Sequence, residues 1–116
     1  PATLRVPLEG AFAMACQLGD PCWEAAVARS MALTFAADDQ LAQAMDWLAE
    51  ARRRCARDSD AYTALQVEIL ASQVDMSVRQ GERELADALA REWVALAART
   101  HVNAHVERAA AFLRGA

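Results

Sequence analysis

Apolar residues recur every three or four positions along most of the chain, which is the period of an amphipathic α-helix. The clearest stripe holds Trp23, Val27, Met31 and Phe35, each four residues after the one before. The pair Asp20-Pro21 comes just ahead of it and supplies an N-cap acceptor and a proline suited to the first helical turn. This pattern predicts a helix over residues 21–37.

Helix-ending and helix-starting residues divide the rest of the chain into five more segments. Gly19 ends a first helix over about residues 7–18, and Gly81 ends a fourth helix over about residues 61–80. The expected starting signals are Asp38-Asp39 for the third helix, Asp58-Ser59-Asp60 for the fourth, and Glu82 with Glu84 for the fifth. The fifth helix carries its apolar line on Leu85, Leu89, Trp93, Leu96 and Ala97, and the sixth on Val102, Val106, Ala109, Ala110 and Leu113.

These segments predict an all-α protein of about six helices. The connections are only two to four residues long, so consecutive helices must lie antiparallel and in contact. No period-two alternation typical of strands occurs, and we expect at least about 70% helix with no strand. The length of 116 residues favours a single domain, 1–116. The pattern leaves open whether the hairpins form a closed bundle or an open array.

Composition narrows the classes of function. The formal net charge is −4, which argues against a phosphate-backbone binder, so no direct contact with nucleic acid is expected. Cys16, Cys22 and Cys55 are odd in number and contain no C-x-x-C pair, which favours a reducing cytoplasm. No apolar run approaches the roughly 20 residues of a membrane span. Because the chain begins at Pro1, we expect a fragment of a longer protein.

A repeat of helix, turn and helix recurs with a period of roughly 40 residues, as in arrays of helical hairpins. The first unit resembles a tetratricopeptide repeat, with the small, aromatic, small, large and small positions held by Ala32, Phe35, Ala44, Leu48 and Ala51. The second unit departs from this pattern because Trp93 stands where a small residue is expected. The resemblance implies a tetratricopeptide-like, right-handed array.

Three stretches resemble the helical-repeat tail of large bacterial signal-transduction ATPases, which include LuxR-type transcriptional regulators and adenylate-cyclase-like regulators. They are residues 18–25 (LGDPCWEA), 48–55 (LAEARRRC) and 96–100 (LAART). The resemblance implies a regulatory segment attached to nucleotide-binding and output domains, so no catalytic residue carries over. The expected function is non-enzymatic protein–protein interaction, within the parent chain or with a partner. The alternatives are a small-molecule effector sensor and, more remotely, an enzyme of unrecognised type.

Few residues qualify as a site, and each has a structural explanation beside it. Trp47 lies off the Leu41–Met45–Leu48 stripe, so it either packs against an adjacent helix or is exposed as a binding anchor. His101 and His105 have the i, i+4 spacing of a zinc site but lack a third ligand, and cap or surface positions are commoner. We therefore expect no metal, no other cofactor and no catalytic residue.

The remaining polar and cysteine positions also have structural explanations. Arg52, Arg53, Arg54 and Arg57 are expected to stabilise a helix end on a solvated face. Cys16 and Cys22 flank one turn and could pair, although a free cysteine usually packs as a small hydrophobe. Asp20 is expected to cap a helix, and Glu24 to favour the helix dipole from the first turn.

The ends of an array leave apolar faces without a neighbour, which predicts self-association of this segment. One such face holds Val102, Val106, Ala109 and Leu113, and the other includes Leu8 and Phe12. A homodimer formed through a terminal helix is the expected result. Val106, at the middle of its stripe, is the candidate interaction residue on that face.

Overall fold

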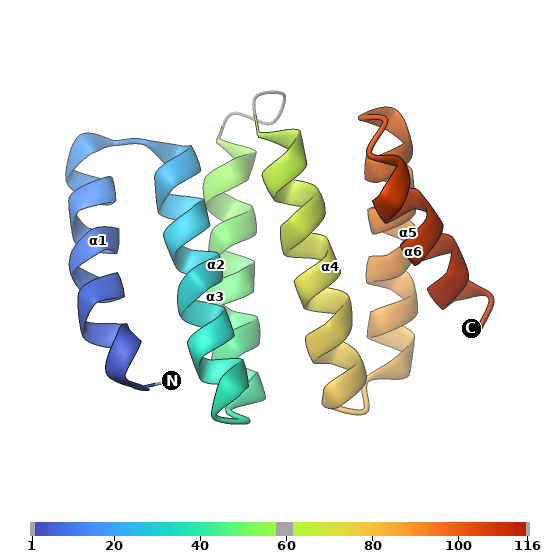
Figure 1. Ribbon diagram of the computed structural model, residues 1–116, viewed down its shortest axis with the longest axis horizontal. Coiled ribbons are helices and arrows are strands. Elements are labelled where there is room, and N and C mark those ends of the chain that lie inside the picture. The colour runs from blue at the N-terminus through green and yellow to red at the C-terminus, as the bar shows by residue number, and fades with distance from the viewer. Residues whose placement is uncertain (1, 58–61, 116) are drawn as a thin grey trace. The chain divides into compact units, whose positions relative to one another are not determined.

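The computed structural model describes residues 2–57 and 62–115, and Figure 1 shows that they form helices joined by short turns. The elements are η1 (Ala2–Leu4), α1 (Arg5–Leu18), α2 (Pro21–Ala37), α3 (Leu41–Ala56), α4 (Thr63–Arg79), α5 (Arg83–Arg99) and α6 (Asn103–Leu113). Helices hold 86% of the described residues, and no strand occurs among them. The prediction of an all-α chain with about six helices is confirmed.

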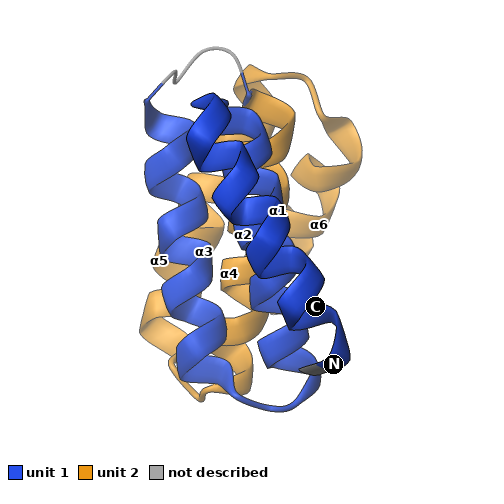
Figure 2. Ribbon diagram, turned by 90° about the vertical axis from the view of Figure 1, so that its left-hand side faces the viewer, with its two compact units in different colours: residues 1–62 blue, residues 63–116 orange. Residues whose placement is uncertain are grey.

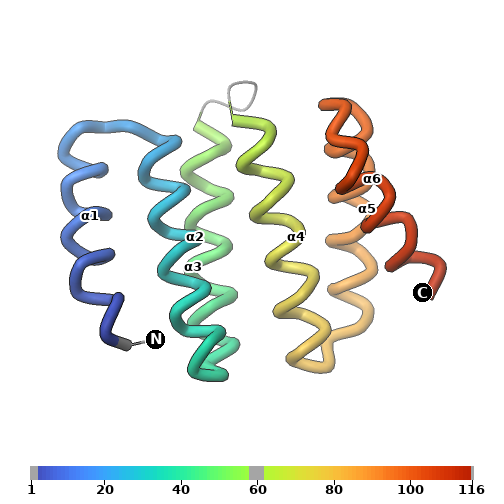
Figure 3. Tube along the Cα trace, viewed as in Figure 1, coloured from blue at the N-terminus to red at the C-terminus, as the bar shows by residue number. Residues whose placement is uncertain are grey.

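The chain divides into two compact units, 1–62 and 63–116, shown in different colours in Figure 2. Unit 1 holds α1, α2 and α3, and unit 2 holds α4, α5 and α6. Within each unit, consecutive helices run antiparallel, as the trace in Figure 3 shows. A continuous right-handed array through both units stays a prediction.

The helix ends at Gly19, Asp20 and Gly81 follow the sequence signals. The Asp20 carboxylate Oδ1 accepts hydrogen bonds from the backbone N–H groups of Cys22 (3.1 Å) and Trp23 (3.2 Å), which caps α2. Gly19 has φ +67° and Gly81 has φ +76°, the left-handed conformation that ends a helix at low cost when the residue is glycine. These three predictions are confirmed.

The start of α3 differs from the prediction. Gln40, not Asp38 or Asp39, is the N-cap of α3, and it makes no side-chain capping bond. Asp39 adopts φ +59° in the turn after α2. Asp38 Oδ2 accepts a hydrogen bond from Arg5 Nη2 (2.5 Å) and forms an ion pair with it. The predicted start of α5 is confirmed, since Glu82 is its N-cap, without a side-chain capping bond, and Glu84 lies in its first turn. The expected caps at residues 58–60 and the expected start of α4 at residue 61 lie outside the described residues.

The core of unit 1 is built largely from alanine. Helix α2 packs against both α1 and α3, and small side chains at the contacts allow the helix axes to approach closely. Four of the five tetratricopeptide-like positions are buried, namely Ala32, Ala44, Leu48 and Ala51. The fifth, Phe35, is half-buried, and the guanidinium of Arg5 lies 4.0 Å from the centre of its ring. The predicted pattern of sizes therefore describes the buried contact between α2 and α3.

In unit 2, α5 packs against α4 and α6. Its buried face is centred on Ala86, Ala90, Trp93 and Ala97. Leu85 was predicted on this face but is 43% exposed, because it lies about 100° around the helix from Ala86. The predicted apolar line of the sixth helix is wrong at its end in the same way, because Leu113 on α6 is exposed.

Candidate functional site

An open groove of about 410 Å³ separates α1 from α3 in unit 1. We call it the α1–α3 groove; its lining residues are Phe12, Asp46, Trp47, Glu50, Arg53 and Arg54. Trp47 is half-buried, and its ring meets that of Phe12 edge-on, with centroids 5.3 Å apart and planes at 89°. Of the two alternatives for Trp47, packing against a neighbouring helix is confirmed. The same residue also lines the groove.

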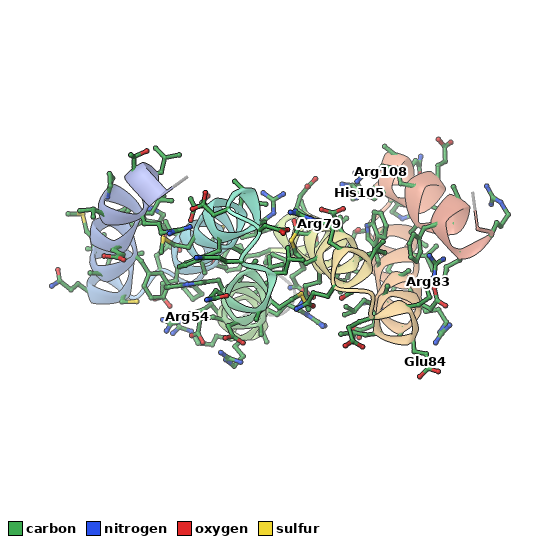
Figure 4. The ribbon with its side chains drawn as sticks, turned by 90° about the horizontal axis from the view of Figure 1, so that it is seen from below. Arg54, Arg79, Arg83, Glu84, His105 and Arg108 are labelled. Carbon is green, nitrogen blue, oxygen red and sulfur yellow. The ribbon has the colours of Figure 1, made fainter. Side chains whose placement is uncertain are left out.

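Arg54 is the most connected side chain in the groove. Its Nε donates to Glu50 (2.7 Å), its Nη1 donates to Glu24 (2.7 Å), and the same Nη1 lies 3.3 Å from Cys16 Sγ. Its guanidinium also lies 5.0 Å from the centre of the Phe12 ring. Figure 4 labels this residue on α3. These contacts fix Arg54 in one orientation beside the aromatic pair.

Glu24 is the buried partner of the arginines. Its side chain is 1% exposed, and its two carboxylate oxygens accept from Arg54 Nη1 and from Arg57 Nη2 (3.1 Å). A buried charge requires such partners because desolvation of an isolated carboxylate is very unfavourable. Glu24 lies in the first turn of α2, as predicted, and the two arginines are further partners that the sequence did not indicate. The prediction that the arginine run lies wholly on a solvated face is wrong for Arg54, which is 24% exposed.

Hydrogen bonds in the groove favour the ionised forms of Glu50 and Arg54. Hydrogen bonds from Arg53 and Arg54 lower the pKa of Glu50, and the hydrogen bonds from Arg54 to Glu24 and Glu50 raise the pKa of Arg54. Asp46, Glu50 and the two arginines lie along one face of α3, at i, i+4, i+7 and i+8. The groove is therefore acidic near Asp46 and basic near Arg53, which suits binding by ionic and aromatic contacts.

A polar network that is buried at Trp93 and His105 and reaches the surface at Glu68 joins three helices in unit 2. The indole Nε1 of Trp93 donates to Nδ1 of His105 (3.0 Å), and Nε2 of His105 lies 2.7 Å from Glu68 Oε1. Because an indole N–H can only donate, Nδ1 is the acceptor and the imidazole proton lies on Nε2, which donates to Glu68. The prediction of a surface or capping position is wrong for His105, which is buried. His101 is exposed in the preceding turn with φ +59°.

Beside this network lies a second cleft, of about 420 Å³, which we call the α4–α6 cleft. It is lined by Ala71, Val74, Asp75, Val78, Trp93, Arg108, Ala111 and Phe112. The guanidinium of Arg108 lies 5.3 Å from the centre of the Trp93 ring, and that of Arg83 lies 4.5 Å from the centre of the Phe112 ring. Val106, the predicted interaction residue, is half-buried and does not line this cleft.

The cysteines lie in three environments: Cys16 is exposed, Cys22 is half-buried and Cys55 is buried. All three are free thiols. Burial raises the pKa of Cys55 to about 11, so its thiol is protonated at neutral pH. Among residues 2–57 and 62–115, no three His, Cys, Asp or Glu side chains gather as metal ligands would.

Sequence reasoning missed the burial and the long-range partners of Glu24 and His105. Glu24 pairs with arginines 30 and 33 residues away, and His105 bonds Glu68, 37 residues away. Helical spacing could have indicated the burial of Glu24, because it lies four and seven residues before the buried Ala28 and Met31 and therefore on the same helix face. His105 likewise lies four residues before the buried Ala109.

No protein-family model, curated protein or solved structure matches the chain. Over the described part of the chain, no helix has both the length and the apolar character needed to cross a bilayer.

Proposed function

We propose that this chain is a non-enzymatic interaction segment of a cytoplasmic bacterial signalling or transcriptional regulator. It binds a protein partner, or another domain of the same regulator, through the α1–α3 groove. The resemblance to helical-repeat tails suggests the class of parent protein, and the tetratricopeptide-like packing of α2 on α3 is consistent with it.

The observation that carries the proposal is the composition of the groove. Tryptophan and arginine are the residues most enriched at the energetic centres of protein interfaces, where they combine apolar area with directed hydrogen bonds. Trp47 and Phe12 supply an aromatic surface beside Arg54, and the side chain of Arg53 is 66% exposed. Because ion pairs and ring contacts already fix Arg54 and Trp47, little side-chain entropy remains to be lost on binding.

Site-specific photo-crosslinking in cells tests the proposal. A photoreactive amino acid placed at Asp46, which is exposed in the groove, should give one discrete crosslinked product with a protein. The same probe at Ala88, exposed on α5 and outside both clefts, is the matched control. Equal crosslinking from both positions would contradict the groove as the binding site.

Two variants sharpen this test. Trp47→Ala removes the aromatic contact and should abolish the product formed from position 46. Arg53→Gln changes a side chain that is 66% exposed, so the fold should be preserved while crosslinking falls. Circular dichroism of both variants separates loss of binding from loss of helix.

Effector sensing is the second candidate function, and the α4–α6 cleft is the observation that favours it. Its volume of about 420 Å³ lies within the range of small-molecule sites, which combine apolar walls with a few polar groups.

A further inference from the structure

The α4–α6 cleft combines an apolar lining with two opposite charges. Val74 and Val78 on α4 face Ala111 and Phe112 on α6, and Trp93 on α5 contributes the floor. Asp75 on the α4 wall and Arg108 on the α6 wall are the two charged lining residues, and both are exposed. The cleft therefore presents one anion and one cation beside an apolar interior.

Neither charge is neutralised by the protein. Among the described residues, no hydrogen bond or ion pair joins Asp75 to another side chain. Arg108 contacts the face of Trp93 through its guanidinium, but within the described chain its N–H groups make no hydrogen bond. The surface ion pairs Arg5–Asp38, Arg53–Glu50 and Arg83–Asp87 differ from these two residues, since each joins opposite charges directly.

The floor of the cleft is held rigidly. Trp93 is 4% exposed, and its indole N–H is fixed by the bond to His105, which is itself bonded to Glu68. The ring cannot rotate without breaking this buried bond. The position of this ring is therefore set before any ligand arrives, which reduces the entropy lost on binding.

We propose that the α4–α6 cleft binds a free apolar α-amino acid, with Asp75 accepting from its ammonium group and Arg108 donating to its carboxylate. The ammonium and the carboxylate of such a ligand are both attached to its Cα, and they complement Asp75 and Arg108. Its apolar side chain can pack against Val74, Val78 and Phe112. This site lies in unit 2 and does not depend on the groove proposed to bind a protein partner.

Titration calorimetry with the full 116-residue chain tests this site. L-phenylalanine and L-leucine are the probes, and at least one should bind saturably. Glycine, 2-phenylethylamine and 3-phenylpropanoate each lack one of the three recognised groups: the apolar side chain, the carboxylate and the ammonium. Each should bind at least about tenfold more weakly than the amino acid, since charge-assisted hydrogen bonds and apolar burial each contribute at this level.

Charge-removing variants identify the two contacts. Asp75→Asn and Arg108→Gln should each weaken amino-acid binding about tenfold or more. Arg108→Gln should leave the weak binding of 2-phenylethylamine unchanged, because this amine has no carboxylate, and Asp75→Asn should likewise spare 3-phenylpropanoate. Glu84→Gln and Arg91→Gln are matched controls outside the cleft; Figure 4 shows Glu84 on the opposite side of unit 2 from Arg108.

Two results would overturn the proposal. One is the absence of binding heat with either amino acid up to about 10 mM, a range that covers even millimolar affinity. The other is binding that Asp75→Asn and Arg108→Gln leave unchanged. Crosslinking from position 46 is independent of both results, so failure of this site and failure of the interaction function can be told apart.

Discussion

Glu24 is a carboxylate enclosed by the core of unit 1, and two guanidinium groups balance its charge. Glu24→Gln keeps the shape but leaves Arg54 without its buried counterion, so we expect the free energy of unfolding to fall by about 2 kcal/mol. Arg57→Gln, whose side chain is 48% exposed, should cost less than about 1 kcal/mol. Urea denaturation measures both. Equal effects would mean that burial of Glu24 does not set the strength of its pairs.

Cys55 makes stability depend on pH at the alkaline end. Burial raises its pKa from about 9 to about 11, so as pH rises the unfolded thiol ionises before the folded one. Ionisation therefore favours the unfolded state, and the contribution of Cys55 to stability falls between about pH 9 and 11. Urea midpoints measured across this range should fall less steeply in Cys55→Ala than in the wild-type chain. Parallel slopes would show that the thiol of Cys55 is accessible to water.

For single residues, the sequence indicated which side chains to consider as site candidates better than it indicated which residues they contact. Trp47 could be singled out because it departs from a helical stripe, and its contact with Phe12 explains that departure. His105 was misassigned, and the arginine partners of Glu24 were missed, because these partners come from other helices. Pairing over such separations depends on how helices rotate against one another, which a local pattern does not specify.

At the scale of helices, replacing a glycine by alanine is expected to lower stability at Gly81 and to raise it at Gly10. Gly81→Ala places a Cβ in open space but at φ +76°, so conformational strain alone should lower stability by about 1 kcal/mol. Gly10→Ala lies within α1, also in open space, and should raise stability by about 0.5–1 kcal/mol through helix propensity. Thermal melting followed by circular dichroism should show shifts in opposite directions. A higher melting temperature for Gly81→Ala would contradict the αL role of Gly81, and a lower one for Gly10→Ala would contradict the argument from helix propensity.

Helix number and most helix ends were predictable because they depend on neighbours in sequence. Gly19, Asp20 and Gly81 act through local backbone conformation and local hydrogen bonds. Asp38 and Asp39 misled the prediction because aspartate suits both a cap and the turn after a helix. Here Asp39 takes the left-handed turn position, and Asp38 binds Arg5, which lies 33 residues away.

For the whole molecule, the helical periodicity of the sequence was enough to predict the all-α class. It was not enough to predict where the two clefts lie. The α1–α3 groove brings Phe12 beside Trp47, and the α4–α6 cleft brings Asp75 near Arg108, across 35 and 33 residues of chain. Both juxtapositions depend on helix packing geometry. The sequence located Trp47 as a candidate but did not indicate either cleft.

The distribution of exposed apolar side chains changes where self-association is expected. On the sixth helix, Ala109 is buried and Val106 is half-buried, so much of the predicted stripe is covered within unit 2. The N-terminal elements expose more apolar surface: Leu4, Val6, Met14 and Leu18 are 52–75% exposed. A cavity of about 440 Å³ lined by Leu4, Pro7, Leu8 and Leu33 adjoins this surface. Exposed apolar side chains concentrated on the N-terminal elements favour association through these elements.

We therefore expect a homodimer that forms through α1 and weakens when a charge is placed on its outer side. Met14→Glu replaces a side chain that is 54% exposed, so α1 should stay helical while the dimer dissociates at least about tenfold more readily. Val106→Glu is the matched substitution on α6 and should leave the association constant unchanged. Sedimentation velocity over a range of concentrations measures both variants against the wild-type chain. Dissociation by Val106→Glu alone would place the contact on α6, and a wild-type chain that is monomeric throughout would show that the exposed side chains of α1 do not drive self-association.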